Sequence, residues 1–563
     1  MEENKATAIP GLKNIKRVVV LMFENRSFDH IFGALPGVNG LFKDGAVNRD
    51  YYNLPDPLQP PSPSNPPVYP APIDPYHPMA RDFNHDFGDG MMPDLYGPTF
   101  TTNPAHAAPS NPCATFTSGY ANGAPTGQIP NPRTYPETNS GFYSTFQGTH
   151  GKIERQGQAS LTYFEDGKLK VLHALAKNFI VCDNWHCDMP GHTLPNRTFI
   201  HCGTTGSVQI DDTDQGQNNS RTIFQVIDRF CALRHIPPRQ GWKMYTPASN
   251  NGGLGQTDLR FLNFDIQNSA KDHKQVAPIT EFADDCKGGT LPLYSFIMCW
   301  LPGGTYDDWE DTSMHPNSLI QPGENLLAAI YNTLRATDCW QDTLLIVTFD
   351  ENGGIYDHVF PPQTTPPNSA RPVVQQSVTG CCGTKWILNS VFDFALLGLR
   401  VPALLISPWL KPGIDSNQYQ NTSVLRFLID RLNDWAEPSQ VHIDPLTQRD
   451  KNAPSLESAF AQFGLDAMRH DCPERIEHYK PSDLPGYPYQ EIPYGDGKLT
   501  VWTPPEGIKS APPVSYVNEL LDIYVASLPG HPDSGKKIAR SFATNAEVAS
   551  YLEERLQAAG AAY

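Results

Sequence analysis

Two acidic segments follow apolar stretches of the chain and carry oxygen donors suited to a metal ion. Glu24 and Asn25 come directly after one apolar run. Asp350 and Glu351 come directly after another. Adjacent carboxylates at the end of a buried strand repel each other unless a cation compensates them, and carboxylate and amide oxygens are ligands that hard divalent ions prefer. The sequence therefore predicts one divalent metal ion; calcium is favoured, and manganese, iron and zinc stay open.

A hydroxyl group lies in a short loop after a third apolar run. Thr193 stands between Gly191 and Pro195. Direct coordination to a metal ion lowers the pKa of a hydroxyl, so Thr193 can attack as an alkoxide without a neighbouring histidine base. Asn196 and Arg197 follow and supply N–H donors for an anionic substrate oxygen. We therefore predict Thr193 as nucleophile and metal ligand, with Asn196 and Arg197 binding the substrate.

Strand and helix patterns alternate along the chain and predict how these residues are positioned. Five short apolar runs rich in β-branched residues predict buried strands, at residues 15–23, 179–182, 292–299, 343–349 and 401–407. Amphipathic patterns predict helices at residues 220–233, 324–335 and 422–432. The alternation is typical of an α/β fold with a mostly parallel central sheet flanked by helices. Ligands bind outside the carboxyl ends of such strands, where the acidic segments lie.

The composition excludes several classes of protein. The 42 Lys and Arg residues against 60 Asp and Glu residues give a formal charge of −18, which argues against a nucleic-acid-binding protein because these normally carry a basic stripe. No apolar run approaches the roughly 18–20 residues that span a bilayer. The first residues lack the basic and apolar parts of a cleavable signal peptide. We expect a soluble protein, either cytoplasmic or exported by a signal-independent route.

The length of 563 residues exceeds that of a single core, roughly 250–300 residues. We predict a catalytic domain at residues 1–475 and a C-terminal extension at 476–563 that ends in a helix after a capping box at Thr544. A surface excursion is predicted at about 53–137, because eleven of the 24 residues from 55 to 78 are prolines, which cannot pair in a sheet. The eleven cysteines lack zinc-site spacing. Buried free thiols are favoured, and one or two disulfides stay open.

Four motifs occur in order along the chain: ENRSFDH, TLPNR, FDENGGIYDHV and LRVPALLISPW. Together they resemble the bacterial phospholipase C and acid phosphatase family, also called the phosphoesterase family, within the alkaline phosphatase superfamily. The resemblance spans roughly residues 15–434. The threonine of TLPNR is closer to the phospholipase C branch, since the acid phosphatase branch typically carries serine there. The resemblance implies an alkaline-phosphatase-like sandwich.

The resemblance also implies roles for individual residues. Glu24, Asn25, Thr193, Asp350 and Glu351 would form the metal shell, and Thr193 would pass through a phosphothreonine intermediate. Family members place histidines near the leaving group, and the motif contexts here favour His85 and His315. Imidazole suits proton transfer to a leaving alkoxide because its pKa lies near neutrality. His358, as a substrate contact, and His192 are weaker candidates.

The sequence departs from the family pattern near the substrate. A histidine common in the family is Asn421 here, and an acidic residue usual before His315 is Met314. These changes leave the metal ligands intact and affect the substrate pocket. Aromatic side chains in or near the motifs could surround a quaternary ammonium head group; the candidates are Trp185, Tyr306, Trp309 and Tyr356.

We therefore predict a metal-dependent phosphoric ester hydrolase of the phospholipase C type that cleaves the glycerol-side phosphodiester bond. One alternative is a broad-specificity phosphomonoesterase with the same metal centre, and another is a non-catalytic effector or binding protein that retains the fold. The expected partner is a phosphate ester, with a phospholipid as one candidate. Membrane contact is expected to be transient because the chain is acidic and shows no basic amphipathic anchor. The sequence leaves the oligomeric state open.

Overall fold

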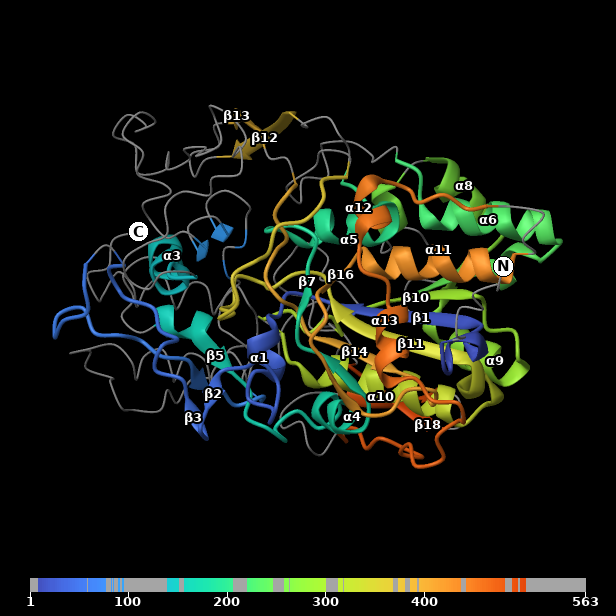
Figure 1. The fold of residues 1–563 in the computed structure, drawn as a ribbon, viewed down its shortest axis with the longest axis horizontal. Coiled ribbons are helices and arrows are strands. Elements are labelled where there is room, and N and C mark those ends of the chain that lie inside the picture. Colours follow the sequence, from blue (N-terminus) through green and yellow to red (C-terminus); the bar gives the residue numbers. More distant parts are fainter. Residues whose placement is uncertain are drawn as a thin grey trace, which may run out of the picture.

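A computed structural model of the protein (Figure 1) describes most of residues 9–502. The described residues are 9–57, 59–76, 83, 85, 90–91, 94–95, 139–150, 156–205, 220–246, 258–262, 264–299, 312–316, 318–367, 373–379, 385–391, 394–436, 442–480, 489–494 and 497–502.

An eight-stranded sheet forms the centre of the molecule. Its order is β15 (Gly413–Asp415), β6 (Ile180–Cys182), β14 (Ala403–Ile406), β11 (Thr343–Phe349), β1 (Arg17–Phe23), β10 (Tyr294–Met298), β8 (Trp242–Thr246) and β9 (Val276–Pro278). β14 is antiparallel to both of its neighbours, and the other pairs are parallel. All five apolar runs form strands of this sheet, which confirms the predicted α/β class. β8, β9 and β15 were not predicted, because short strands at or near a sheet edge have little apolar signal.

Helices cover both faces of the sheet (Figure 1). One layer contains α5 (Thr193–Cys202), α6 (Ile223–Arg234) and α11 (Ser423–Trp435), and the other contains α4 (Leu172–Asn178) and α10 (Gln321–Arg335). The three predicted helices correspond to α6, α10 and α11. α6 begins after Thr222, which forms a capping box with Gln225. α10 begins three residues earlier than predicted, because its first turn accommodates Pro322.

The remaining elements are short. The helices are η1 (Leu12–Asn14), α1 (Phe28–Phe32), α3 (Phe142–His150), η5 (Gln156–Leu161), α7 (Pro238–Gly241), η9 (Asp258–Phe261), α8 (Phe264–Asp272), α9 (Ile279–Gly288), η10 (Asp338–Asp342), α12 (Gln448–Asn452) and α13 (Glu457–Phe463). Two-stranded pairs join β2 (Phe42–Lys43) to β3 (Ala46–Val47), β4 (Ala71–Pro72) to β5 (Thr162–Tyr163), β7 (Trp185–His186) to β16 (Tyr419–Gln420), β12 (Val373–Thr379) to β13 (Lys385–Val391) and β17 (Tyr489–Tyr494) to β18 (Gly497–Trp502).

A residue of the Pro-rich excursion packs next to the FDENGGIYDHV motif. Phe83 forms a small hydrophobic cluster with Phe146 and Ile355, apart from the main core. Contrary to the prediction, the excursion does pair with another strand, since β4 runs parallel to β5. The pairing uses the N–H of Ile73, which donates to the carbonyl of Tyr163 over 2.9 Å, so Pro72 need not donate.

The start of the predicted C-terminal extension is tied to α10. The N–H of Ile476 donates to Oδ1 of Asn332 over 2.8 Å, and the Tyr479 hydroxyl donates to Glu324 over 2.8 Å. The predicted terminal helix after Thr544 lies outside the described residues, and the domain boundary stays a prediction.

Two further expectations concern cysteines and membrane spans. The eight cysteines within the described segments are buried free thiols, and the adjacent pair Cys381–Cys382 lies outside those segments. Over the same part of the chain, no helix combines the length and apolar character needed to cross a bilayer.

Candidate active site

The ends of β1 and β11 bring the two acidic segments side by side. These strands pair in parallel register up to their last residues, so Glu24 and Asn25 leave the sheet next to Asp350 and Glu351. The backbone N–H of Asn25 donates to Oδ1 of Asp350 over 3.0 Å, although the two residues are 325 positions apart. The structure therefore groups the predicted ligands of both segments at one edge of the sheet.

A tight turn makes this approach feasible. Asn25 has a left-handed backbone with φ of 60°, a conformation that a non-glycine residue adopts only at an energetic cost. Gly353, with φ of 65°, packs directly against it, and a Cβ at that position would lie 2.2 Å from the carbonyl oxygen of Asn25. The N–H of Gly353 also donates to Oε2 of Glu351 over 2.5 Å. The glycine turn thus fixes both the backbone of Asn25 and the carboxylate of Glu351.

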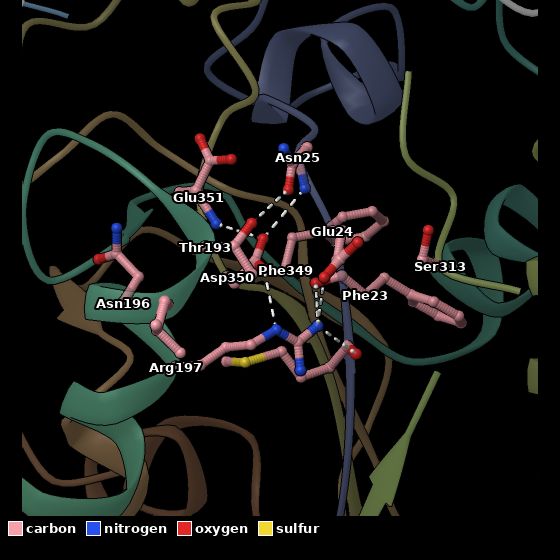
Figure 2. A network of polar contacts seen from close by, with 12 residues as sticks. Phe23, Glu24, Asn25, Thr193, Asn196, Arg197, Ser313, Phe349, Asp350 and Glu351 are labelled. Carbon is pink, nitrogen blue, oxygen red and sulfur yellow. Dashed lines mark hydrogen bonds and ion pairs between the residues drawn. The ribbon is translucent and has the colours of Figure 1, made fainter. Parts of the chain in front are cut away.

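Thr193 faces the same point from a third element. It is the first residue of α5 rather than a loop residue as predicted, because Pro195 is tolerated in the first turn of a helix. Its Oγ1 donates to Oδ1 of Asn25 over 3.0 Å. Figure 2 shows Thr193 and Asp350 both directed toward Asn25. The N-terminus of α5 therefore presents the hydroxyl together with the positive end of the helix dipole, which suits an anionic substrate.

Asn196 holds the loop that leads to Thr193. Its side chain is fully buried and accepts the N–H of Met189 over 3.1 Å. Its amide group donates to the carbonyls of Met189, Gly191 and His192 at 3.1–3.2 Å. These contacts assign Asn196 to holding the loop before Thr193, in place of the predicted contact with substrate.

Histidines from separate segments meet at the amide of Asn25. Its Nδ2 lies 2.9 Å from Nε2 of His315 and 3.2 Å from Nε2 of His85. The opposite nitrogen of His85 donates to the carbonyl of Phe83 over 2.6 Å, which leaves Nε2 as the acceptor of the Asn25 amide proton. The ring of His192 lies 4.9 Å from that of His85. The structure therefore places both predicted histidines next to the residue that contacts Thr193.

Arg197 lies beneath the carboxylates (Figure 2). Its Nε donates to Oδ2 of Asp350 over 3.0 Å, and its Nη atoms lie 3.5 Å from Glu24 and 3.7 Å from Asp258. Burial alone would lower the pKa of Arg197, but Asp258, Asp350 and Glu24 raise it well above its usual value. Burial raises the pKa of Asp350, and Arg197 opposes that shift. With 1% of its surface exposed, Arg197 is a counter-ion of the carboxylates rather than a contact for substrate, which corrects the prediction.

The oxygen donors at this edge are of the kind that a hard divalent cation prefers. Glu24, Asp350 and Glu351 supply three carboxylates, and Asn25 and Thr193 add an amide and a hydroxyl oxygen. Among the described residues, the acidic and histidine ligand atoms that lie within 4.8 Å of one another belong to a different group, Asp29, Asp357 and His358. The three carboxylates are therefore not drawn together at metal-ligand spacing, and the metal ion at this edge stays a prediction.

His358 belongs to a second cluster, with Asp29 and Asp357. The ligand atoms of these three residues lie within 4.8 Å of one another, a spacing that could hold a metal ion. However, Arg400 already donates to both carboxylates at 2.9 Å. Burial raises the pKa of Asp29, yet His358 and Arg400 hold it below its ordinary value. This cluster joins α1 to the segment after β11, and a contact between His358 and substrate stays a prediction.

The aromatic candidates for a head-group site divide into two pairs. Trp185 is fully buried and donates from Nε1 to Oδ1 of Asn421 over 2.8 Å. Tyr356 is also buried. Both side chains therefore belong to the core, which corrects the predicted substrate contact of Trp185. Tyr306 and Trp309 lie outside the described residues.

Two residues support the site in ways that sequence reasoning did not assign. Asp258 bridges Arg197 to His201, whose Nε2 is 2.8 Å away, and no motif marks it. Asn421 donates to the carbonyls of Phe349 and Asp350 at 3.2 and 3.1 Å. Its replacement of a family histidine marked the position, but only the tertiary structure shows that it holds the end of β11.

These features agree with a comparison of sequences. The profile of the phosphoesterase family matches residues 15–433. The chain belongs to the phosphoesterase family. This match includes both acidic segments, Thr193 and His315, and so confirms the family resemblance.

Relatives of this phosphoesterase include several named phospholipases C. Non-specific phospholipase C5 of Arabidopsis thaliana is 28% identical over 82% of this chain and 77% of its own length. Non-hemolytic phospholipase C of Burkholderia pseudomallei is 25% identical over 87% of this chain and 66% of its own length. Phospholipase C A of Mycobacterium tuberculosis is 28% identical over 75% of this chain and 74% of its own length. A solved protein of the alkaline phosphatase superfamily from Vibrio parahaemolyticus is 12% identical, with a TM-score of 0.27 over 59% of this chain and 70% of that one.

The family and these relatives identify the chain as a phosphoric ester hydrolase. The expectation of an enzyme is therefore confirmed, and the alternative of a non-catalytic binding protein is set aside.

Proposed function

We propose that this phosphoesterase is a metal-dependent phospholipase C that cleaves the glycerol-side bond of a phospholipid through a phosphothreonine intermediate. One observation carries the proposal. The hydroxyl of Thr193 lies 3.0 Å from one end of the Asn25 amide, and the Nε2 atoms of two histidines lie 2.9 and 3.2 Å from its other end. A nucleophile and two proton-transfer groups thus converge on one point beside the carboxylates.

The nucleophile is the Oγ1 atom of Thr193. Glu24, Asn25, Thr193, Asp350 and Glu351 would hold the metal ion, calcium by the chemistry of its oxygen ligands, and the bound ion would supply charge that favours the alkoxide and polarises a phosphoryl oxygen. The first turn of α5 adds backbone N–H groups beside the attacked phosphate.

The two histidines transfer the protons. Thr193 reacts as the alkoxide, its proton having passed to water; its Oγ1 forms a bond to phosphorus, and the bond from phosphorus to the glycerol oxygen breaks. In its imidazolium form, His315 or His85 exchanges the contact of Nε2 with the Asn25 amide for one with that oxygen and donates the Nε2 proton to it, and diacylglycerol leaves. Water then attacks phosphorus and loses a proton to the same Nε2, and the bond to Thr193 breaks to release the phosphorylated head group. General acid–base catalysis of this kind contributes about 10²–10⁴-fold in rate.

The names of the relatives support a diester substrate. The three relatives described above are phospholipases C from a plant and two bacteria. A lipid substrate requires the site to approach a membrane surface, and the acidic chain favours a transient contact. Cleavage of a monoester in preference to a diester would instead support the phosphomonoesterase alternative.

Replacement of Thr193 tests the nucleophile. Thr193→Ala should lower kcat with a phosphocholine diester by about 10³-fold or more, because attack and activation are lost together. Thr193→Ser keeps the hydroxyl and should retain measurable turnover. Both variants should unfold like the parent, since Thr193 is partly exposed, and Thr193→Ala should still retain metal through the four other proposed ligands.

A covalent adduct provides a second measurement. Acid quenching during turnover, followed by peptide mass spectrometry, should find head-group phosphate on the peptide that contains Thr193. Chelation should abolish turnover, and metal should restore it. Substantial activity in Thr193→Ala would eliminate the nucleophile, and full activity after complete removal of metal would eliminate the metal dependence.

A further inference from the structure

Arg26 connects the ligand segment to the loop that carries His315. Its Nε donates to the carbonyl of Met314 over 2.6 Å, and its Nη2 donates to the carbonyl of His315 over 3.1 Å. On the other side of Asn25, the N–H of Glu24 donates to the carbonyl of Ser313 over 2.9 Å. The residues before and after the ligand Asn25 therefore hold three successive carbonyls of the histidine loop.

The loop needs this support because its backbone is strained. Met314 has φ of 68°, and left-handed conformations of this kind persist only when neighbouring groups enforce them. The side chain of Met314 fills a notch at Gly323 in α10, where a Cβ would lie 2.4 Å from Met314 Cγ. The notch and the guanidinium of Arg26 thus fix opposite sides of the residue that precedes His315.

Arg26 is itself held in place from the other end. Its Nη1 lies 2.9 Å from Nε2 of His30, whose Nδ1 donates to the carbonyl of Thr162 over 2.7 Å. Burial first, and then the charge of Arg26, lower the pKa of His30 well below its usual value. A neutral His30 accepts the Arg26 proton, so the guanidinium is oriented by a fully buried partner.

From these contacts we propose that Arg26 is a positioning residue that aligns His315 for protonation of the leaving oxygen. The proposal deepens the proposed function and rests on it. Arg26 acts through the peptide bonds on both sides of His315, and it sets the distance between Nε2 of His315 and the Asn25 amide. Misplacement of a catalytic group by about 1 Å can lower a rate by about 10²-fold.

Dependence on the leaving group tests this role. p-Nitrophenylphosphocholine and a short-chain phosphatidylcholine share a head group, but only the alkoxide leaving group of the lipid needs protonation. Arg26→Lys keeps the charge and loses the second carbonyl contact. It should lower kcat/KM for the lipid by about 10–100-fold and for the nitrophenyl ester by less than about threefold. In Arg26→Lys/His315→Ala, the ratio of the two rates should equal that of His315→Ala alone.

Arg469→Lys is the matched control. Arg469 also donates to two carbonyls, those of Asn178 and Leu410 at 2.9 and 3.2 Å, but these precede β6 and follow β14, at the edge of the sheet opposite to the ends of β1 and β11. This variant should lower thermal stability without changing the ratio of rates. An unchanged ratio in Arg26→Lys, or an additive loss in the double variant, would overturn the proposal. Failure of the unaltered protein to cleave either ester would instead overturn the proposed function.

Discussion

At the scale of single residues, the site depends on charge compensation by Arg197. This side chain contacts Asp350 at 3.0 Å and Glu24 at 3.5 Å, and it is almost fully buried. Removal of one partner from a buried ion pair leaves an uncompensated charge in a medium of low polarity. A residue that bound substrate would instead change KM with little effect on folding. These two roles predict different results for the same substitution.

Arg197→Lys should lower the free energy of unfolding of the metal-free protein by about 2–4 kcal/mol, because an ammonium cannot meet three carboxylates at once. The KM for substrate should change by less than about threefold while kcat falls. Urea unfolding and steady-state kinetics measure both effects. Arg426→Lys, at a partly exposed pair with Asp430, is the control and should cost less than about 1 kcal/mol. A large rise in KM with unchanged stability would restore Arg197 as a substrate contact.

At the scale of elements, the turn after β11 decides how closely β1 and β11 can bring their polar ends together. Gly353 lies where any side chain would overlap the carbonyl of Asn25. Gly45, in the β2–β3 turn, has a similar φ of 80°, but no atom lies within 4 Å of the position that a Cβ would take there. Both glycines have a positive φ, but only at Gly353 would an added Cβ overlap another backbone atom.

Gly353→Ala should therefore abolish most activity and lower the free energy of unfolding by about 3 kcal/mol or more, since strain and overlap add. Gly45→Ala should lower stability by about 1 kcal/mol through strain alone and leave activity unchanged. Thermal unfolding and turnover of a phosphate ester measure the difference. Equal losses of activity in the two variants would show that the approach of Gly353 to Asn25 does not shape the site.

At the scale of the whole molecule, Glu324 joins three parts of the chain. It lies in α10, and its Oε1 accepts the N–H groups of Val171 and Leu172 at the start of α4, at 2.9 and 2.8 Å. Its Oε2 accepts the hydroxyl of Tyr479 over 2.8 Å. Burial raises the pKa of Glu324 to about 7, against the effect of these hydrogen bonds. The joint is therefore most stable when this carboxyl is protonated.

The sign of the pH dependence follows from this shift. The folded protein binds the proton more tightly than the unfolded chain, whose glutamate has an ordinary pKa of 4.5. The stabilisation is complete below about pH 4.5 and is lost as the pH rises through about 7, a change of about 3 kcal/mol. Glu324→Gln keeps the acceptor and offers N–H to Tyr479. The variant should have the same unfolding free energy as the parent at pH 5 and a larger one at pH 8, as measured by urea unfolding. An equal difference between variant and parent at the two pH values would contradict this.

The sequence by itself determined the central strands and the identity of the chemical groups. The runs that became β1 and β11 are apolar over most of their length, because both faces of an internal strand are buried. Acidic residues directly after such strands indicated the edge where Glu24 and Asp350 meet. The motifs then indicated Thr193, His85 and His315, and the structure brings these three together around Asn25.

Only the tertiary structure decided which polar groups face the site and which support it. Asn196 binds its own loop, Arg197 binds carboxylates from two strands, and Trp185 is buried against Asn421. The partners of these side chains come from segments remote in sequence, apart from the loop of Asn196. Local pattern reports whether a residue is polar and where its element ends, whereas its partner depends on how distant strands and helices pack together.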